Sequence, residues 1–329
     1  MKRRDAILGI ALLGTSIARA RAQQGKVFRV GVLRPGTAKE PASVQREPFE
    51  RGLRELGWKP GSNVLIDYRY GEGDPTRLAP LAAELIGKRI DVAVIAGAPA
   101  AWAIRKASAG VPIVMAAIND PIGEGFTTNL ARPGGNATGI FIHTFEMDGK
   151  RLELLKDAFP SIRRVALLAN PAGEPKGFAP RMADLREGAR RMGVELEVFE
   201  LAQKSDLPGT HAALQRGRFD ALMVRPEPQL IDLIRFELVA MAAKLRLPAI
   251  YAFRFYAEAG GLMSYGESIP AFHHRSASYV DRILKGANAG DLPFERPTKF
   301  ELTVNLKAAK ALGLEIPKSV LFRADEVIQ

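Results

Sequence analysis

The first half of this chain carries an order of apolar and amphipathic segments that the second half repeats. The apolar run Arg29–Leu33 is matched 135 positions later by Arg164–Leu168. The amphipathic segment Phe49–Gly57 ends at a glycine, as does its counterpart Leu185–Gly193, 136 positions later. Two further matches keep the same order, Asp91–Ile95 with Asp220–Val224 and Val111–Met115 with Leu247–Tyr251. With 329 residues, more than one ordinary domain needs, the chain is expected to form two similar lobes.

The type of each segment follows from its periodicity. Short continuous apolar runs bounded by Gly or Pro predict buried strands, and apolar residues three or four apart predict helices. The expected strands are 29–33, 64–70, 92–96, 113–117, 164–168, 195–201, 220–224 and 247–251, and the expected helices are 49–57, 78–86, 100–109 and 185–193. Strands that alternate with helices pair in parallel through crossovers. We therefore predict an α/β fold with two doubly wound parallel-sheet lobes.

The segments after residue 256 break the repeated order. They predict a strand within Gly260–Gly266, a helix over Ile269–Lys285, a strand at Leu302–Val304 and a helix over Leu306–Leu312. Extra elements after the second lobe imply that the chain returns to the first lobe and crosses again, which makes a multi-strand hinge. The expected division is 27–142 plus 257–294 for the N-terminal lobe and 143–256 plus 295–329 for the C-terminal lobe.

The N-terminus has the features of a secretory signal peptide. Three basic residues at positions 2–4 precede the mostly apolar run Ala6–Ala18, and small residues at 18, 20 and 22 form an Ala-x-Ala exit. The run is too short to cross a bilayer, which needs about 20 residues. We therefore assign residues 1–22 to a signal peptide and predict a periplasmic protein.

Charge and cysteine content exclude several classes of function. Loss of residues 1–22 removes five basic residues and one acidic residue, so the net charge falls from +11 to +7. No block of five or six basic residues is present, so we expect no nucleic-acid partner. The chain has no cysteine, which rules out disulfides, thiolate metal sites and a cysteine nucleophile.

Polar and aromatic residues follow the predicted strands. Ligands of doubly wound sheets bind beyond the carboxyl ends of the strands, so loops from both lobes are expected to line one site. Backbone N–H groups at the starts of the helices there can bind a carboxylate. Acidic side chains in the same loops can bind an ammonium group, and aromatic rings add apolar surface. This combination indicates an amino-acid-like or carboxylate ligand. The candidate ligand-binding residues are Arg34, Ala98, Pro99, Asn119, Asp120, Asn170, Glu227, Phe255 and Tyr256.

Several of these residues have a structural alternative. Asp120 precedes a proline and could cap a turn, and Glu227 lies between two prolines and could be solvated. Arg34 could face an anion or water. Trp102, one turn into a helix, is expected to pack rather than to stack on a ligand. Tyr251 and Phe253 are expected in the core.

No motif indicates catalysis. Gly123–Thr128 lacks the third glycine of a dinucleotide loop, and Ser264 lacks the spacing of a nucleophile elbow. None of the four histidines has the spacing of a zinc helix, and the adjacent His273 and His274 are expected on different helix faces. We predict no catalytic residue, no metal and no cofactor.

Five longer motifs carry a resemblance to a known family. They are Leu130–Gly139, Ala259–Gly266, Pro297–Leu302, Asn305–Gly313 and Arg323–Val327. From about Val27 to the C-terminus the chain resembles the tryptophan/tyrosine-type family of ABC-transporter substrate-binding proteins, which have a type 1 periplasmic-binding fold. The resemblance implies a receptor that closes on a small molecule by hinge motion and delivers it to an ABC permease in the inner membrane. We expect a monomer.

The resemblance leaves the ligand open. Members of the family often carry Thr at the position of Ala98 and a small residue at that of Asn119, and the segment Gly125–Leu130 departs from the usual aliphatic one. Aromatic amino-acid specificity is therefore not assumed. Three rival functions are a ligand-sensing transcription regulator, an extracytoplasmic α/β enzyme and a periplasmic receptor for a signalling partner. A regulator would need a DNA-reading helix pair before Val27, where the signal peptide is predicted instead.

Overall fold

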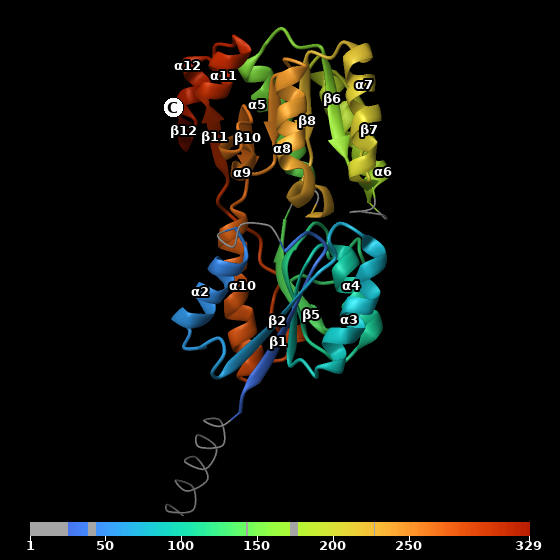
Figure 1. Cartoon of the computed structure of the whole chain (residues 1–329), viewed down its shortest axis with the longest axis vertical. Helices are drawn as coiled ribbons and strands as arrows, with labels where there is room; N and C mark the ends of the chain where they lie inside the picture. The colour runs from blue at the N-terminus through green and yellow to red at the C-terminus, as the bar shows by residue number, and fades with distance from the viewer. Residues whose placement is uncertain (1–25, 39–43, 143, 172–176, 227) are drawn as a thin grey trace, which may run out of the picture.

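The computed structural model describes residues 26–38, 44–142, 144–171, 177–226 and 228–329. The predicted signal peptide and Glu227 lie outside these ranges. The described chain forms two α/β lobes, one above the other in Figure 1, each built on its own sheet. The two doubly wound lobes predicted from the repeat are thereby confirmed.

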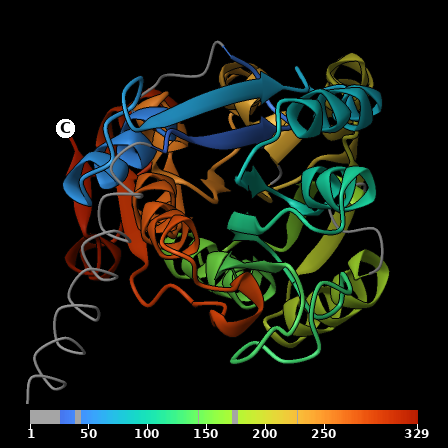
Figure 2. The ribbon, with the colours of Figure 1, turned by 90° about the horizontal axis from the view of Figure 1, so that it is seen from below.

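The first lobe is built on a five-stranded parallel sheet with the order β2-β1-β3-β4-β5. Its strands are β1 (Phe28–Arg34), β2 (Val64–Tyr70), β3 (Val92–Ala96), β4 (Ile113–Ile118) and β5 (Ala137–Phe141). Its helices are α2 (Arg46–Glu55), α3 (Leu78–Gly87), α4 (Ala98–Ala107) and α10 (Ile269–Leu284). Helices α2 and α10 cover one face of the sheet and α3 and α4 the other, as seen from below in Figure 2.

The second lobe is built on a seven-stranded sheet with the order β12-β11-β10-β9-β8-β6-β7. Its strands are β6 (Arg164–Ala169), β7 (Glu195–Glu200), β8 (Ala221–Val224), β9 (Ala249–Tyr251), β10 (Met263–Gly266), β11 (Glu301–Asn305) and β12 (Glu326–Ile328). The helices on one face are α5 (Thr144–Ala158), α6 (Phe178–Arg191), α11 (Leu306–Leu312) and α12 (Lys318–Phe322). Those on the other face are α7 (Leu207–Gly217), α8 (Pro228–Lys244) and α9 (Arg254–Glu258). Strands β10 and β11 run antiparallel, and the other pairs are parallel.

The central strand β1 shows why an uninterrupted apolar run is needed here. Val30 and Val32 face the core beneath α2 and α10, whereas Leu33 faces the core beneath α3 and α4. A parallel strand covered by helices on both faces buries every side chain, so its sequence cannot alternate with polar residues. The same holds for β3, whose five residues are all buried.

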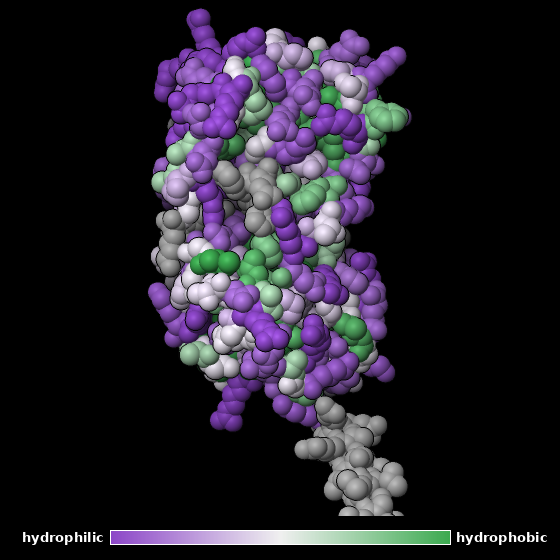
Figure 3. All heavy atoms as spheres, turned by 180° about the vertical axis from the view of Figure 1, so that it is seen from behind, coloured by the Kyte–Doolittle hydropathy of each residue, from purple (hydrophilic) through white to green (hydrophobic). Residues whose placement is uncertain are grey.

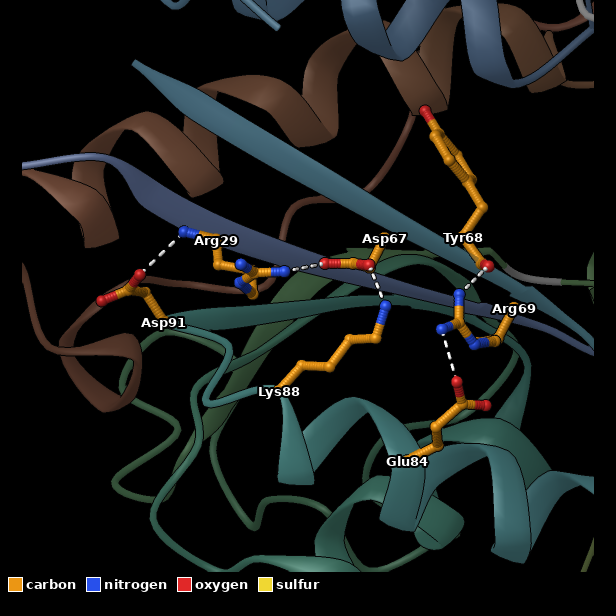
Figure 4. Close-up of polar contacts among 7 residues, drawn as sticks. All are labelled: Arg29, Asp67, Tyr68, Arg69, Glu84, Lys88 and Asp91. Carbon is orange, nitrogen blue, oxygen red and sulfur yellow. Dashed lines mark hydrogen bonds and ion pairs between the residues drawn. The ribbon is translucent and has the colours of Figure 1, made fainter. Parts of the chain in front are cut away.

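The edge strand β2 carries a network of charges instead (Figure 4). Asp67 accepts hydrogen bonds from Arg29 at 2.8 Å and from Lys88 at 2.6 Å, and Arg69 pairs with Glu84 on α3 at 2.6 Å. Burial raises the pKa of Asp67, but the bonds from Lys88 and Arg29 outweigh burial and hold that pKa below its ordinary value. Charged side chains on an edge strand also disfavour pairing with a second chain.

The chain passes between the two sheets three times, after β5, after β10 and before β11. The sequence division assigned 257–294 wholly to the first lobe, but β10 within that stretch pairs with β9 and β11 of the second sheet. The return to the first lobe therefore follows Gly266, and α10 is the element that reaches it. The crossing is delayed because Met263 and Ser264 continue the parallel ladder next to β9 before the chain leaves the sheet.

Polar side chains dominate the surface of both lobes in Figure 3, with apolar ones scattered among them. The large apolar side chains that are exposed in the described ranges lie on separate elements. They are Val27, Leu56, Ile122, Phe236 and Phe322. No described helix is long and apolar enough to span a bilayer.

Candidate ligand-binding site

The carboxyl ends of β1–β5 in the first sheet and of β6–β10 in the second point toward the other lobe (Figure 1). The two lobes are in contact there, because Asp120, in the loop after β4, forms an ion pair with Arg181 on α6 of the second lobe. We call these facing strand ends and the loops that follow them the interlobe site. It is the place where the topology of doubly wound sheets predicts a ligand.

Arg34 ends β1 at the interlobe site. Its loop is held by backbone hydrogen bonds from Gly71 N to Arg34 O at 2.7 Å and from Gly73 N to Pro35 O at 2.9 Å. The Arg34 side chain is buried. Burial, reinforced by the positive charge of Arg34, lowers the pKa of His273 on α10 well below its ordinary value. The first lobe therefore places a buried arginine beside a neutral histidine.

The start of α4 provides both N–H groups and aromatic surface. Gly97 adopts a φ of 79° and precedes the helix, and Ala98 and Pro99 form its first turn. Helix α4 thus begins two residues earlier than predicted. One turn further, the Trp102 ring lies 4.6 Å from that of Phe126, in the loop after β4. The predicted packing role of Trp102 agrees with this contact.

Asp120 is held in a tight turn after β4. Its Oδ1 accepts a hydrogen bond from Gly123 N at 2.8 Å, and its backbone oxygen accepts one from Glu124 N at 2.9 Å. The other carboxylate oxygen, Oδ2, binds Arg181. Asp120 therefore caps a turn, as the structural alternative proposed, and also contacts the opposite lobe. Asn119 precedes it and is half-buried.

The second lobe contributes a buried ionic cluster that the sequence analysis did not identify. Asp148 on α5 accepts hydrogen bonds from Arg151 at 2.8 Å and from Arg225 Nε at 2.6 Å, and none of these side chains is more than 4% exposed. Arg151 also donates to the Tyr265 carbonyl oxygen at 2.7 Å. Arg225 follows β8, so the cluster fixes a second arginine at the interlobe site.

Glu267 joins the same cluster where the chain leaves β10 for the first lobe. Burial raises the pKa of this carboxyl group, and the positive charge of Arg151 only partly opposes the rise. The cluster thus connects α5, β8 and one of the three crossings. Asp148 holds both Arg151 and Arg225 by hydrogen bonds, so the position of Arg225 at the strand end depends on α5.

Aromatic rings gather after β9. Phe255 lies on α9, partly exposed, with its ring 5.2 Å from that of Tyr256. Tyr256 is 1% exposed and stacks on Tyr251 at 4.7 Å, so it belongs to the core. Tyr251 and Phe253 are buried, as predicted.

The structure places most of the predicted residues at strand ends. In the first lobe these are Arg34, Ala98, Pro99, Asn119 and Asp120, and in the second lobe Asn170, buried after β6, together with Phe255. Tyr256 is turned into the core, and Glu227 lies outside the described residues. The residues that sequence reasoning missed are Asp148, Arg151, Arg181, Arg225, Glu267 and His273. Only Arg225 had a signal in the sequence, since it directly follows a predicted strand.

A separate cavity of about 310 Å³ lies beside the crossings, on α10 and the segment before β11. None of the predicted ligand-binding residues lines it. Its walls include the ion pair between Arg275 and Glu295 and the apolar side chains of Ile140 and Phe272. No group of three or more potential metal ligands occurs among the described residues.

Two doubly wound lobes, three crossings and facing strand ends define a type 1 periplasmic-binding fold. The model of the ABC transporter substrate binding protein family matches residues 39–328, and the chain belongs to that family. It is therefore an extracytoplasmic solute-binding protein and not an enzyme.

Known relatives agree with this assignment. The chain is 24% identical over 270 residues to a tyrosine-binding protein of Clostridioides difficile (strain R20291), covering 82% of this chain and 76% of that one. A Streptococcus pneumonia ABC domain solved in complex with L-Trp is 27% identical, with a TM-score of 0.83 over 92% of this chain and 100% of the other. A conserved domain protein of Vibrio cholerae is 26% identical, with a TM-score of 0.84 and the same coverage.

Proposed function

We propose that this protein binds an α-amino acid with an aromatic side chain at the interlobe site and passes it to an ABC permease. The observation that carries the proposal is that buried arginines and aromatic rings occur together at the facing strand ends. Two relatives, a tyrosine-binding protein and a protein solved in complex with L-Trp, support the same class of ligand.

The ligand's carboxylate is matched by cationic groups in both lobes. Arg34 lies at the end of β1 and Arg225 at the end of β8, where Asp148 orients its guanidinium group. The first turn of α4 adds backbone N–H groups at a helix N-terminus, which favour an anion. Guanidinium groups form two parallel hydrogen bonds to a carboxylate, so they give geometric specificity as well as attraction.

The ligand's side chain is matched by aromatic surface on each side. In the first lobe the Trp102 ring is partly exposed on α4, where it packs against the buried Phe126 ring, and in the second Phe255 is partly exposed on α9. Aromatic pairs contribute about 0.5–1.5 kcal/mol beyond the area they bury. A ring held between the two lobes would gain such contacts only when the lobes are together.

Delivery requires export and a membrane partner. We assign residues 1–22 to a signal peptide and the mature chain to the periplasm, as a monomer that presents both lobes to the permease. N-terminal sequencing of the secreted protein tests the first point, with residue 23 expected at the start. Light scattering of the purified protein tests whether it is a monomer in solution.

A thermal-shift series tests the ligand class. L-tryptophan, L-tyrosine and L-phenylalanine are compared with L-leucine, with tryptamine and tyramine, which lack the carboxylate, and with glucose as an unrelated solute. A ligand at a hundredfold excess over Kd stabilises the folded state by about 2.7 kcal/mol, a shift that is readily measured. We expect stabilisation by at least one aromatic amino acid and none by the two amines. Equal stabilisation by the amines, or no effect of any amino acid, would refute the proposal.

The variant Arg34→Gln tests the carboxylate contact directly. We expect loss of affinity for the aromatic amino acid, because the neutral amide cannot replace the charge. The matched control is Arg54→Gln, which removes an exposed arginine in the last turn of α2, a position in the first lobe that does not follow a strand end of the interlobe site. Unchanged affinity in Arg34→Gln would remove Arg34 from the site.

A further inference from the structure

We propose that Asp120 and Arg181 form a latch that sets how often the two lobes are closed, and through this the affinity for the ligand. The effect on affinity rests on the proposed function, whereas the effect on the lobes does not. The interaction joins the two lobes, so separation of the lobes at the interlobe site would break it. Asp120 follows β4 of the first sheet, and Arg181 lies on α6, which follows β6 of the second.

The carboxylate of Asp120 is prepared for this contact by its own turn. Gly123 N donates to Oδ1 at 2.8 Å, which fixes the direction of the side chain and leaves Oδ2 to accept from Arg181. The side chain of Asp120 is 32% exposed and that of Arg181 is 21% exposed. The pair is therefore at the margin of the interlobe site, where water can replace either partner when the lobes separate.

The position of Arg181 gives it a reason to bind an acid. It lies in the first turns of α6, a 14-residue helix whose first turn contains no acidic residue. The N-terminal end of a helix carries a partial positive charge, so a cation there is unfavourable by itself. Asp120 offsets this repulsion from the opposite lobe. Opening the lobes separates Asp120 from Arg181 and leaves the repulsion between Arg181 and the N-terminus of α6 uncompensated. This repulsion therefore adds to the free energy that opening costs.

Both members of the latch lie where a glycine leaves space for them. A Cβ atom added to Gly177, just before α6, would lie 2.7 Å from the Arg181 Cζ atom. A Cβ atom added to Gly123 would lie 2.2 Å from Asp120 Oδ2. Neither glycine has a positive φ, so glycine is favoured at these two positions by its small size and not by its backbone freedom. Alanine at either position would displace the latch without changing any charge.

The latch and the ligand act on the same equilibrium. An interaction present only in the closed state raises the closed population, and the apparent affinity of a ligand that needs this state rises with that population. A partly exposed ion pair contributes up to a factor of about five to such an equilibrium. Loss of the latch is therefore expected to lower the closed-to-open ratio up to about fivefold, and to weaken ligand binding by a similar factor where the open state predominates.

The lobe distance without ligand is the decisive measurement. The chain has no native cysteine, so spin labels are introduced at Lys106→Cys on α4 and Asp184→Cys on α6, both exposed. Double electron–electron resonance spectroscopy then gives the distribution of distances between the two spin labels, one on each lobe. We expect Asp120→Asn and Arg181→Gln each to shift it toward longer distances, and the double variant to shift it no further than one of them. An unchanged distribution, or additive shifts in the double variant, would overturn the proposal.

Glycine variants separate the latch from general effects of charge. Gly177→Ala is expected to lengthen the lobe distance in the native background and to have no effect in the Arg181→Gln background. The control is Gly188→Ala on the same helix, where an added Cβ meets no atom within 4 Å. A Gly177→Ala effect that persists without Arg181 would contradict the latch.

Titration with L-tryptophan and L-tyrosine distinguishes the latch from the proposed function. If neither binds the unmodified chain but the distances shift as expected, the latch stands and the ligand assignment fails. If binding occurs but the distances do not respond to the variants, the latch fails alone.

Discussion

Replacing Asp148 by asparagine tests whether the buried ionic cluster stabilises the second lobe. The Asp148 side chain is fully buried and accepts hydrogen bonds from two arginines, Arg151 at 2.8 Å and Arg225 at 2.6 Å. The neutral amide would leave two guanidinium groups in the interior without a counter-charge on α5. Breaking a buried ion pair by removal of one partner costs about 3–5 kcal/mol. That is a large part of the about 5–15 kcal/mol that separates folded from unfolded proteins.

Urea unfolding of Asp148→Asn and of a control variant measures this loss of stability. With a slope of about 3 kcal/mol per M, the midpoint of Asp148→Asn should fall by about 1 M or more. The control is Asp157→Asn on the same helix, whose exposed pair with Arg323 at 2.7 Å is expected to contribute at most about 1 kcal/mol. Equal midpoints for the two variants would show that Asp148 does not compensate the buried arginines. The reasoning about the cluster would then be wrong.

Three further predictions concern other buried positions. Burial lowers the pKa of His273 well below 6.5, so the unfolded chain binds the proton first and stability should fall as pH drops below about 6.5; urea midpoints of His273→Gln should lack this component. Burial raises the pKa of Glu267 above 4.5, so the folded state keeps the proton longer and stability should fall as pH rises from 4.5 through the raised pKa; Glu267→Gln should remove that slope, and an unchanged slope would contradict the assignment. Gly139→Ala should destabilise by several kcal/mol or prevent folding, because φ is 138° and the added Cβ would lie 2.1 Å from the Met115 oxygen; Gly149→Ala, which meets nothing within 4 Å, should retain its thermal midpoint.

Two strands of the first sheet could be predicted to the residue. The strands at 64–70 and 92–96 have the bounds that periodicity indicated. Strand β5 was not predicted, because Gly139 interrupts its apolar run and there adopts a φ that other residues avoid. Helix α5 was not predicted either. It turns Asp148 and Arg151 inward, so its buried face does not read as apolar.

The candidate site was predictable only where it depends on a single sheet. Arg34, Asp120 and Asn170 lie at strand ends because parallel topology places them there. The contact between Asp120 and Arg181 depends on how two separately folded sheets approach each other, which no local pattern encodes. Tyr256, predicted as a ligand-binding residue, is buried, because the five-residue helix α9 turns it back onto Tyr251.

Helix α10 has a consequence for how the polypeptide matures during synthesis. It packs against α2 and the five-stranded sheet, yet it is made of residues 269–284. A nascent chain that has emerged only as far as β9 therefore still exposes the part of its N-terminal sheet that α10 will cover. The first lobe can therefore finish folding only after residues 269–284 have been made, when most of the second lobe has already left the ribosome.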